Sequence, residues 1–153
     1  SLLFGILSDS IGQKKTIIIS LYIWIVTMVF AFIISDETNS ILIYFANLLG
    51  SGIKNFQTAS FYLVGLLAGS VMGATQSTSR SMMTKLTPKE KKTEFIGFYS
   101  LFGKSSAIIG PLVFGIISYV TENQSYAILS ISVFFVIGLY ILRYVTDGVE
   151  QRT

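Results

Sequence analysis

Residues 16–35 read TIIISLYIWIVTMVFAFIIS, a run of twenty residues without a single charged side chain. A helix needs about 20 mostly apolar residues to cross the hydrocarbon core of a bilayer. Three further mostly apolar stretches of sufficient length follow, at residues 60–80, 95–120 and 126–146. The sequence therefore predicts an all-α integral membrane protein with about four transmembrane helices.

The composition agrees with this fold class. The chain of 153 residues is 52% hydrophobic and only 12% charged, whereas soluble domains contain about 25% charged residues. Cysteine and histidine are absent, so we expect no disulfide, no thiolate metal site and no imidazole base. The basic residues lie between apolar runs, which argues against a nucleic-acid partner. We expect a protein without cofactor or metal, surrounded by a lipid bilayer.

The positions of lysine and arginine predict the orientation, because cytoplasmic segments of membrane proteins have an excess of both. With residues 1–15 in the cytoplasm, nine basic residues fall on that side, Lys54 alone falls on the other, and Lys104 lies inside the third span. The nine are Lys14, Lys15, Arg80, Lys85, Lys89, Lys91, Lys92, Arg143 and Arg152. We therefore expect both ends of the chain in the cytoplasm, with residues 36–60 and 121–125 on the far side.

Two connecting segments have readable local signals. The apolar stretch from Ile41 to Leu49 is too short to cross a bilayer, so we expect an interfacial or re-entrant part of the far-side loop. Thr87 and Pro88 are typical of the N-cap and the first position of a helix. A helix is therefore expected to begin near Pro88 and to run toward Phe95.

Small residues spaced by four distinguish the second and third spans. They are Gly65, Gly69, Gly73, Ser77 and Ser81 in the second span, and Gly103, Ala107, Pro111 and Gly115 in the third. Such ridges allow close helix packing in lipid, so we expect these two spans to pack together. Gly110 and Pro111 suggest either a static kink or a hinge. The first and fourth spans are rich in large aliphatic and aromatic residues, and we expect them to face lipid.

Four polar side chains are candidates for a substrate path. Lys104 lies about nine residues into the third span, near the expected bilayer centre, where a lysine costs about 2.5–3.5 kcal/mol. Tyr99 precedes it on the same helix. Arg80 and Gln76 lie among hydroxyl residues at the end of the second span, and a guanidinium with hydroxyls suits a carboxylate or phosphate. The alternatives are a paired or snorkelling Lys104 and an interfacial anchor at Arg80.

Residues 5–15, GILSDSIGQKK, resemble the loop signature of the major facilitator superfamily, GxLxDxxGxKK. The matching residues are Gly5, Asp9, Gly12, Lys14 and Lys15. Ser10 and Gln13 stand where that signature usually has basic residues. In the superfamily this loop latches the cytoplasmic side in one of the alternating-access states, so the resemblance implies a gating role for the matching residues.

A longer series of matches is similar to the vacuole-effluxer-like, autophagy-related branch of that superfamily. The matching segments are residues 76–81, 86–88, 94–99 and 103–112. The resemblance implies the last four of twelve helices, with helices three to six as the competing placement, and N-terminal helices that this chain lacks. It also implies that the first and fourth spans are peripheral in the fold.

The resemblance implies a secondary carrier that moves a small solute, with amino acids as candidate solutes and a coupled ion as a candidate partner. No acidic residue lies inside a span, so a proton-relay carboxylate would belong to the missing part. The alternative is a non-transporting membrane scaffold or assembly subunit, which would leave Lys104 without a cavity. An enzyme is disfavoured, since acid–base and metal chemistry lack their usual residues. A bacterial inner membrane and a fungal vacuole both stay open as host membranes.

Overall fold

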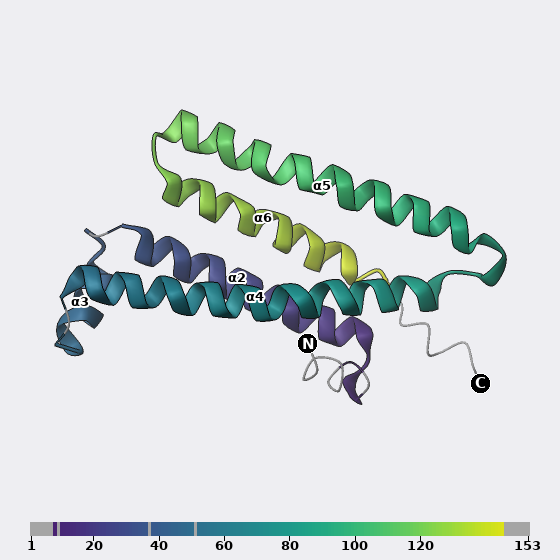
Figure 1. Cartoon of the computed structure of the whole chain (residues 1–153), viewed down its shortest axis with the longest axis horizontal. Helices are drawn as coiled ribbons and strands as arrows, with labels where there is room; N and C mark the ends of the chain where they lie inside the picture. Colours follow the sequence, from purple (N-terminus) through teal and green to yellow (C-terminus); the bar gives the residue numbers. More distant parts are fainter. Residues whose placement is uncertain (1–7, 9, 37, 51, 146–153) are drawn as a thin grey trace.

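The structure is a computed structural model that describes residues 8, 10–36, 38–50 and 52–145. Its elements in chain order are α2 (Gln13–Ser35), α3 (Ser40–Leu48), α4 (Ile53–Leu86), the 3-10 helix η1 (Lys89–Lys91), α5 (Lys92–Thr121) and α6 (Gln124–Leu142) (Figure 1). Four helices, α2, α4, α5 with η1, and α6, are long and apolar enough to cross a membrane. The predicted all-α class with four spans is therefore confirmed.

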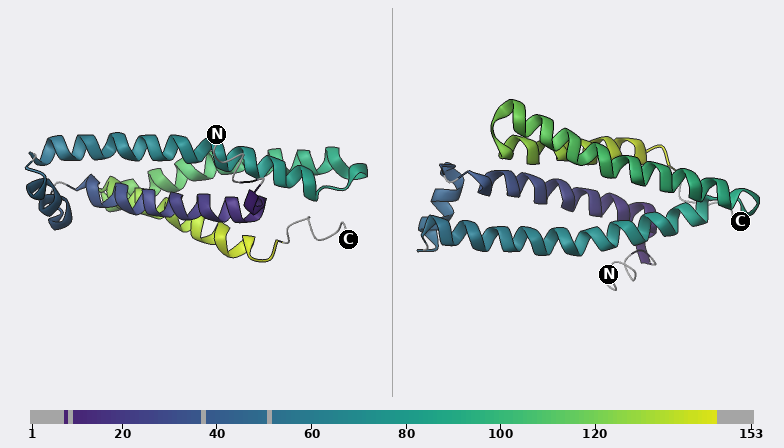
Figure 2. Two further views of the ribbon diagram at one scale, coloured as in Figure 1. Left: turned by 90° about the horizontal axis from the view of Figure 1, so that it is seen from below. Right: turned by 45° about the horizontal axis from the view of Figure 1, so that its top comes forward.

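The four long helices fall into two length classes. The 23 residues of α2 and the 19 residues of α6 extend over about 34 and 28 Å, close to the roughly 30 Å thickness of a hydrocarbon core. The 34 residues of α4 and the 30 of α5 extend over about 50 and 45 Å. The expected span 60–80 is thus only the central part of α4, whereas the expected span 95–120 covers nearly all of α5. Both helices project beyond α2 and α6 toward η1 (Figures 1 and 2).

The central helix of the bundle is α2. It packs against both α4 and α6, whereas α5 packs mainly against α6. No contact of comparable extent joins α4 to α5 within the described parts of the chain. The expectation that the second and third spans pack together was therefore wrong. The helices pack in the sequence α4, α2, α6, α5, so α2 and α6 separate the second span from the third.

A buried face of small and polar residues places α2 at the centre. Gln13, Ser20, Thr27 and Ile34 are buried at intervals of seven residues, so they lie on one side of the helix. Ser20 Oγ donates to the Thr16 carbonyl at 2.9 Å, and Thr27 Oγ1 donates to the carbonyl one turn before it at 2.7 Å. Both buried hydroxyls therefore have a hydrogen-bond partner within their own helix. The small side chains that bear them let the neighbouring helices approach closely.

Aromatic contacts join α2 to α6. Trp24 stacks on Phe135 with ring centroids 5.3 Å apart and planes 11° from parallel. Phe32 lies near Tyr126 with centroids 6.0 Å apart. Such pairs contribute about 0.5–1.5 kcal/mol each beyond the burial of their area. Part of the surface of the first and fourth spans therefore packs against the other span, and only the remaining surface of each is available to lipid.

Hydrogen bonds fasten both ends of α2 to α4. At the first residue of α2, Gln13 Nε2 donates to Ser81 Oγ. At the opposite end, Gln57 Nε2 donates to the carbonyl of Ile34 at 2.8 Å. Because the start of α2 meets the end of α4 and the reverse, the two helices are antiparallel and their relative height is fixed.

The same arrangement joins α2 to α6. Lys14 Nζ donates to the carbonyl of Arg143, directly after α6, at 3.3 Å. At the other end, the hydroxyl oxygens of Ser35 and Ser125 lie 2.7 Å apart. Each end of α2 thus has one hydrogen bond to α4 and one to α6, and these four contacts define the levels of the bundle.

The segment between α4 and α5 departs from the sequence prediction in one respect. Thr87 Oγ1 and the Thr87 N–H both donate to the carbonyl of Met83, at 2.7 and 3.1 Å. Thr87 therefore completes the end of α4 and does not cap the next helix, because η1 follows Pro88 without a side-chain cap. A helical segment does begin directly after Pro88, as the proline indicated.

Because α2 is central, we expect its buried side to tolerate larger side chains less well than its exposed side. Ala31 is 5% exposed and Val26 is 67% exposed. Overpacking at a buried position costs about 1–3 kcal/mol, so Ala31→Leu should destabilise the protein by that amount. Val26→Leu, at an exposed position, should change stability by less than about 0.5 kcal/mol. Denaturation of the complete carrier in detergent checks both, and an equal tolerance of the two leucines would contradict the central place of α2.

Candidate substrate path

The four polar candidates lie on two helices that are not packed together. Gln76 and Arg80 belong to α4, and Tyr99 and Lys104 belong to α5. Gln76, Arg80 and Lys104 are exposed, and Tyr99 is half-buried. Neither the Lys104 ammonium nor the Arg80 guanidinium has a partner among the residues that the structure describes. The chain by itself therefore does not assemble the four side chains into one site.

The length of the neighbouring helix α6 changes the level expected for Lys104. The third span was expected to begin near Phe95, whereas α5 begins at Lys92 and ends at Thr121. Seventeen residues separate Lys104 from Thr121, a distance of about 25 Å along the helix, and the adjoining α6 is about 28 Å long. Because α5 and α6 are the two arms of a hairpin, Lys104 lies level with the last turn of α6. This position is closer to one end of the four-helix bundle than to its middle.

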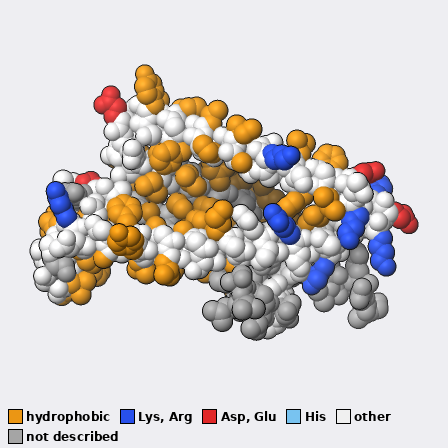
Figure 3. All heavy atoms as spheres, viewed as in Figure 1, with side chains coloured by type: hydrophobic (Ala, Val, Ile, Leu, Met, Phe, Trp, Pro, Cys, Tyr) orange, Lys and Arg blue, Asp and Glu red, His pale blue; other side chains and the backbone are white. Residues whose placement is uncertain are grey.

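The residues on α4 lie at the same height. Arg80 adjoins Ser81, which is bonded to the first residue of α2. Gln76 lies four residues further into the membrane, about 6 Å along the helix. Figure 3 shows several basic side chains toward this end of the molecule. Lys104, Arg80 and Gln76 therefore share one end of the bundle although they do not touch.

The gating-loop residues are only partly described. Gly5 and Asp9 lie outside the described residues. Gly12 has a φ of 89°, a conformation in which residues with a Cβ are strained. Its carbonyl accepts hydrogen bonds from the N–H and the Oγ1 of Thr16, at 3.2 and 2.9 Å. Glycine at this position lets the chain turn directly into α2.

The two lysines of the loop differ, and the structure adds a residue that the sequence reasoning did not propose. Lys14 is half-buried and its ammonium donates a hydrogen bond to the Arg143 carbonyl, whereas Lys15 is exposed. Gln13 had been noted only as a departure from a basic residue, yet it is buried and bonded to Ser81. An amide at the first residue of a span must find a partner when it is buried, and this rule would have singled out Gln13.

The small-residue ridges face open space. A Cβ added at Gly65, Gly69, Gly73 or Gly110 would meet no atom within 4 Å. Pro111 is exposed, and α5 continues through it as one helix. The glycines of the ridges on α4 and α5 are therefore not used for packing between the described elements, whereas Ser81 at the end of the α4 ridge contacts Gln13 of α2.

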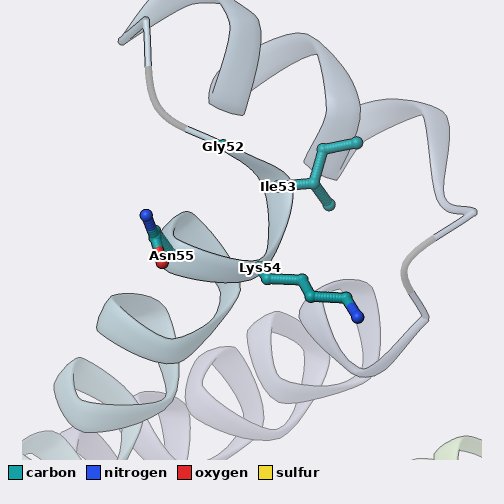
Figure 4. A pocket seen from close by; sticks show the side chains of 4 residues that line it. All are labelled: Gly52, Ile53, Lys54 and Asn55. Atoms are coloured by element: carbon teal, nitrogen blue, oxygen red, sulfur yellow. The ribbon is translucent and has the colours of Figure 1, made fainter.

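A hollow at the far end of α4 does not belong to this set. It encloses about 320 Å³ and is lined by Gly52, Ile53, Lys54 and Asn55. The side chains of Lys54 and Asn55 point in different directions and do not converge (Figure 4). No group of three or more potential metal ligands occurs in the described ranges of the chain. The polar features of interest therefore remain Gln76, Arg80 and Lys104.

The Gln13–Ser81 hydrogen bond can be measured by a double-mutant cycle in the complete carrier. A neutral hydrogen bond contributes about 0.5–1.5 kcal/mol, so Gln13→Leu and Ser81→Ala should show a coupling energy of that size in denaturation experiments. Thr84 lies on the same helix, and within the described ranges its hydroxyl donates only to the Arg80 carbonyl. The control pair Gln13→Leu and Thr84→Val should show no coupling, and equal values for both pairs would contradict the contact.

Comparison with known proteins gives the family. The profile of the family described as "Vacuole effluxer Atg22 like" matches residues 1–151. The chain is 30% identical over 147 residues, 96% of its length, to the uncharacterized MFS-type transporter YxiO of Bacillus subtilis. It is 35% identical over 78 residues, 51% of its length, to autophagy-related protein 22 of Kluyveromyces lactis.

These relatives are much longer than the chain. It covers 29% of the Bacillus protein and 16% of the Kluyveromyces protein. No solved structure matches the chain with statistical significance. The family profile nevertheless covers almost every residue, including all four long helices. The chain belongs to the vacuole effluxer Atg22-like family, and its predicted place in that branch is confirmed.

Proposed function

We propose that this chain is part of a secondary carrier that moves a small solute across a membrane by alternating access. The match of the family profile to residues 1–151 supports this most strongly, together with a bundle of four potential spans. The Bacillus relative is described as an MFS-type transporter. In such carriers the substrate site lies between two halves of the molecule.

The open faces of α4 and α5 support this proposal. None of the residues of α5 is buried, and its exposed side chains include Phe98, Phe102 and Ile108. The chain covers only 29% of the Bacillus protein, so a complete carrier of that length has further helices available. We propose that these helices pack on α4 and α5 and that the ridges of Gly65, Gly69 and Gly73 face them.

The charge of the candidate residues suggests the chemistry of the solute. Arg80 and Lys104 are cationic, exposed and at one level of the bundle, and Gln76 adds a neutral donor and acceptor. A guanidinium and an ammonium at the edge of a membrane fit a solute with a carboxylate, such as an amino acid. Because no carboxylate lies in the predicted spans, coupling to an ion would use residues outside this chain.

The orientation also belongs to the proposal. The end of the bundle that contains Lys14, Arg80, Lys104 and Arg143 holds most of the basic residues, and Lys54 lies at the other end. The positive-inside rule then places the first end in the cytoplasm. The polar candidates would form the cytoplasmic mouth of the path, where a lysine near the membrane face is less costly than at the centre.

Transport by the complete carrier tests the role of Lys104. Lys104→Met removes the charge and keeps a flexible side chain of similar length, so we expect normal accumulation with loss of amino-acid uptake or efflux in vesicles. Lys85→Met, at the exposed end of α4, is the matched control and should transport normally. Wild-type transport by Lys104→Met at equal abundance would contradict the role of the lysine. If the wild-type carrier transports none of the solutes tested, the result would favour the alternative function, a non-transporting membrane scaffold or assembly subunit.

Cysteine labelling tests the orientation, and the natural absence of cysteine makes the probes specific within this chain. A carrier with Lys54→Cys should react with an impermeant maleimide added outside intact cells. A carrier with Lys91→Cys should react only after the membrane is opened. The reverse pattern would show that the orientation derived from the basic residues is wrong.

A further inference from the structure

The short helix α3 lies where α2 and α4 leave the membrane. Short connections join it to the end of α2 and to the start of α4, and it runs across the direction of both (Figures 1 and 2). Its N-terminus is capped by Asn39, whose Oδ1 accepts from the N–H of Ile41 at 3.0 Å. Gly50, with a φ of 64°, turns the chain directly after it. The helix is therefore defined by its own caps.

The two sides of α3 differ in their surroundings. Leu42 and Ala46, one turn apart, are 1% and 0% exposed, and α3 packs against α4 and, to a smaller extent, α2. Five large hydrophobic side chains of the segment are exposed instead: Ile41, Tyr44, Phe45, Leu48 and Leu49. Figure 3 shows hydrophobic side chains gathered over this end of the molecule. One side of α3 is thus packed, and the other presents an apolar surface.

The level of α3 follows from Asp36, which directly succeeds α2. The N–H and the Oγ1 of Thr38 donate to Asp36 Oδ1 at 2.9 and 2.6 Å, and they hold the pKa of this carboxyl below its ordinary value. A carboxylate is costly inside a bilayer, and Asp36 is the first acidic residue after the uncharged run of α2. Gln57, bonded to Ile34, sets the first turns of α4 at the same height. α3 therefore lies at the end of the bundle where α2 ends and α4 begins.

We propose that α3 lies in the interfacial zone of the leaflet opposite the basic end, with its exposed side chains inserted among lipids. Residues 38–52 contain no charged residue, whereas a water-facing helix usually has several. An exposed apolar patch at the membrane boundary finds its apolar surroundings in lipid. A tyrosine such as Tyr44 is typical of this zone, because one end of its ring is apolar and the other bears a hydroxyl that can be hydrated.

This placement gives α3 a mechanical role. It packs against α4 and, to a smaller extent, α2, and short connections join it to both helices. A helix anchored in the interface resists displacement of both spans along the membrane normal. The role does not depend on which solute the carrier moves, or on whether it moves one.

Site-directed spin labelling tests the lipid contact. Single cysteines replace Tyr44, Phe45 or Leu48 in a complete carrier without other cysteines, and the labelled proteins are placed in vesicles of phosphatidylcholine and phosphatidylglycerol. Lys54→Cys, exposed at the start of α4, is the aqueous reference. We expect the ratio of accessibility to oxygen over accessibility to a water-soluble nickel complex to be several-fold higher at Phe45 and Leu48 than at Lys54.

Each other outcome overturns the proposal. A ratio at Phe45 and Leu48 equal to that at Lys54 would place the exposed side of α3 in water. Low accessibility to both reagents would show that another segment of protein covers it. Agreement among the three labelled positions guards against a local effect of one label, and transport measured on the same samples shows that the carrier is intact.

Discussion

The polar contacts of α2 determine the arrangement of the other helices. Lipid offers no hydrogen-bond partners, so a buried amide or hydroxyl in a span must be satisfied by protein. Gln13 at the start of α2 is satisfied by α4, and Ser35 at its end lies against Ser125 of α6. The hydroxyls between them turn to carbonyls of their own helix. A helix fastened in this way has one height and one rotation relative to its two neighbours.

The levels of the candidate residues depend on this arrangement. Because Gln13 meets Ser81, Arg80 lies at the height where α2 begins. Because Lys14 meets the carbonyl of Arg143, the end of α6 lies at that height as well. The hairpin of α5 and α6 then brings Lys104 to the same end. The basic side chains therefore share one end of the bundle even though α4 and α5 are not in mutual contact.

Much of the fold could be predicted from the sequence, because the length and apolarity of a span are local properties. The family was recognisable for the same reason, since residues 76–81 and 103–112 form motifs that need no structure. The packing order was not predictable from ridges such as Gly65 and Gly69. These glycines indicate a close approach but not its partner, and they meet no other described element of this chain. The central place of α2 was missed because Thr27 and Ser20 are minor interruptions in an apolar run, and only their spacing of seven marks a packed face.

The most direct test of the central place of α2 is a disulfide between its end and α6. The hydroxyl oxygens of Ser35 and Ser125 lie 2.7 Å apart, and replacement of serine by cysteine changes the shape of the side chain little. The complete carrier with Ser35→Cys and Ser125→Cys should form this disulfide on mild oxidation in membranes, because the two side chains point toward each other. The pair Ser35→Cys and Ser130→Cys, more than a turn further along α6, should not. Failure of the first pair to cross-link, or equal cross-linking of both pairs, would contradict the arrangement of α2 described above.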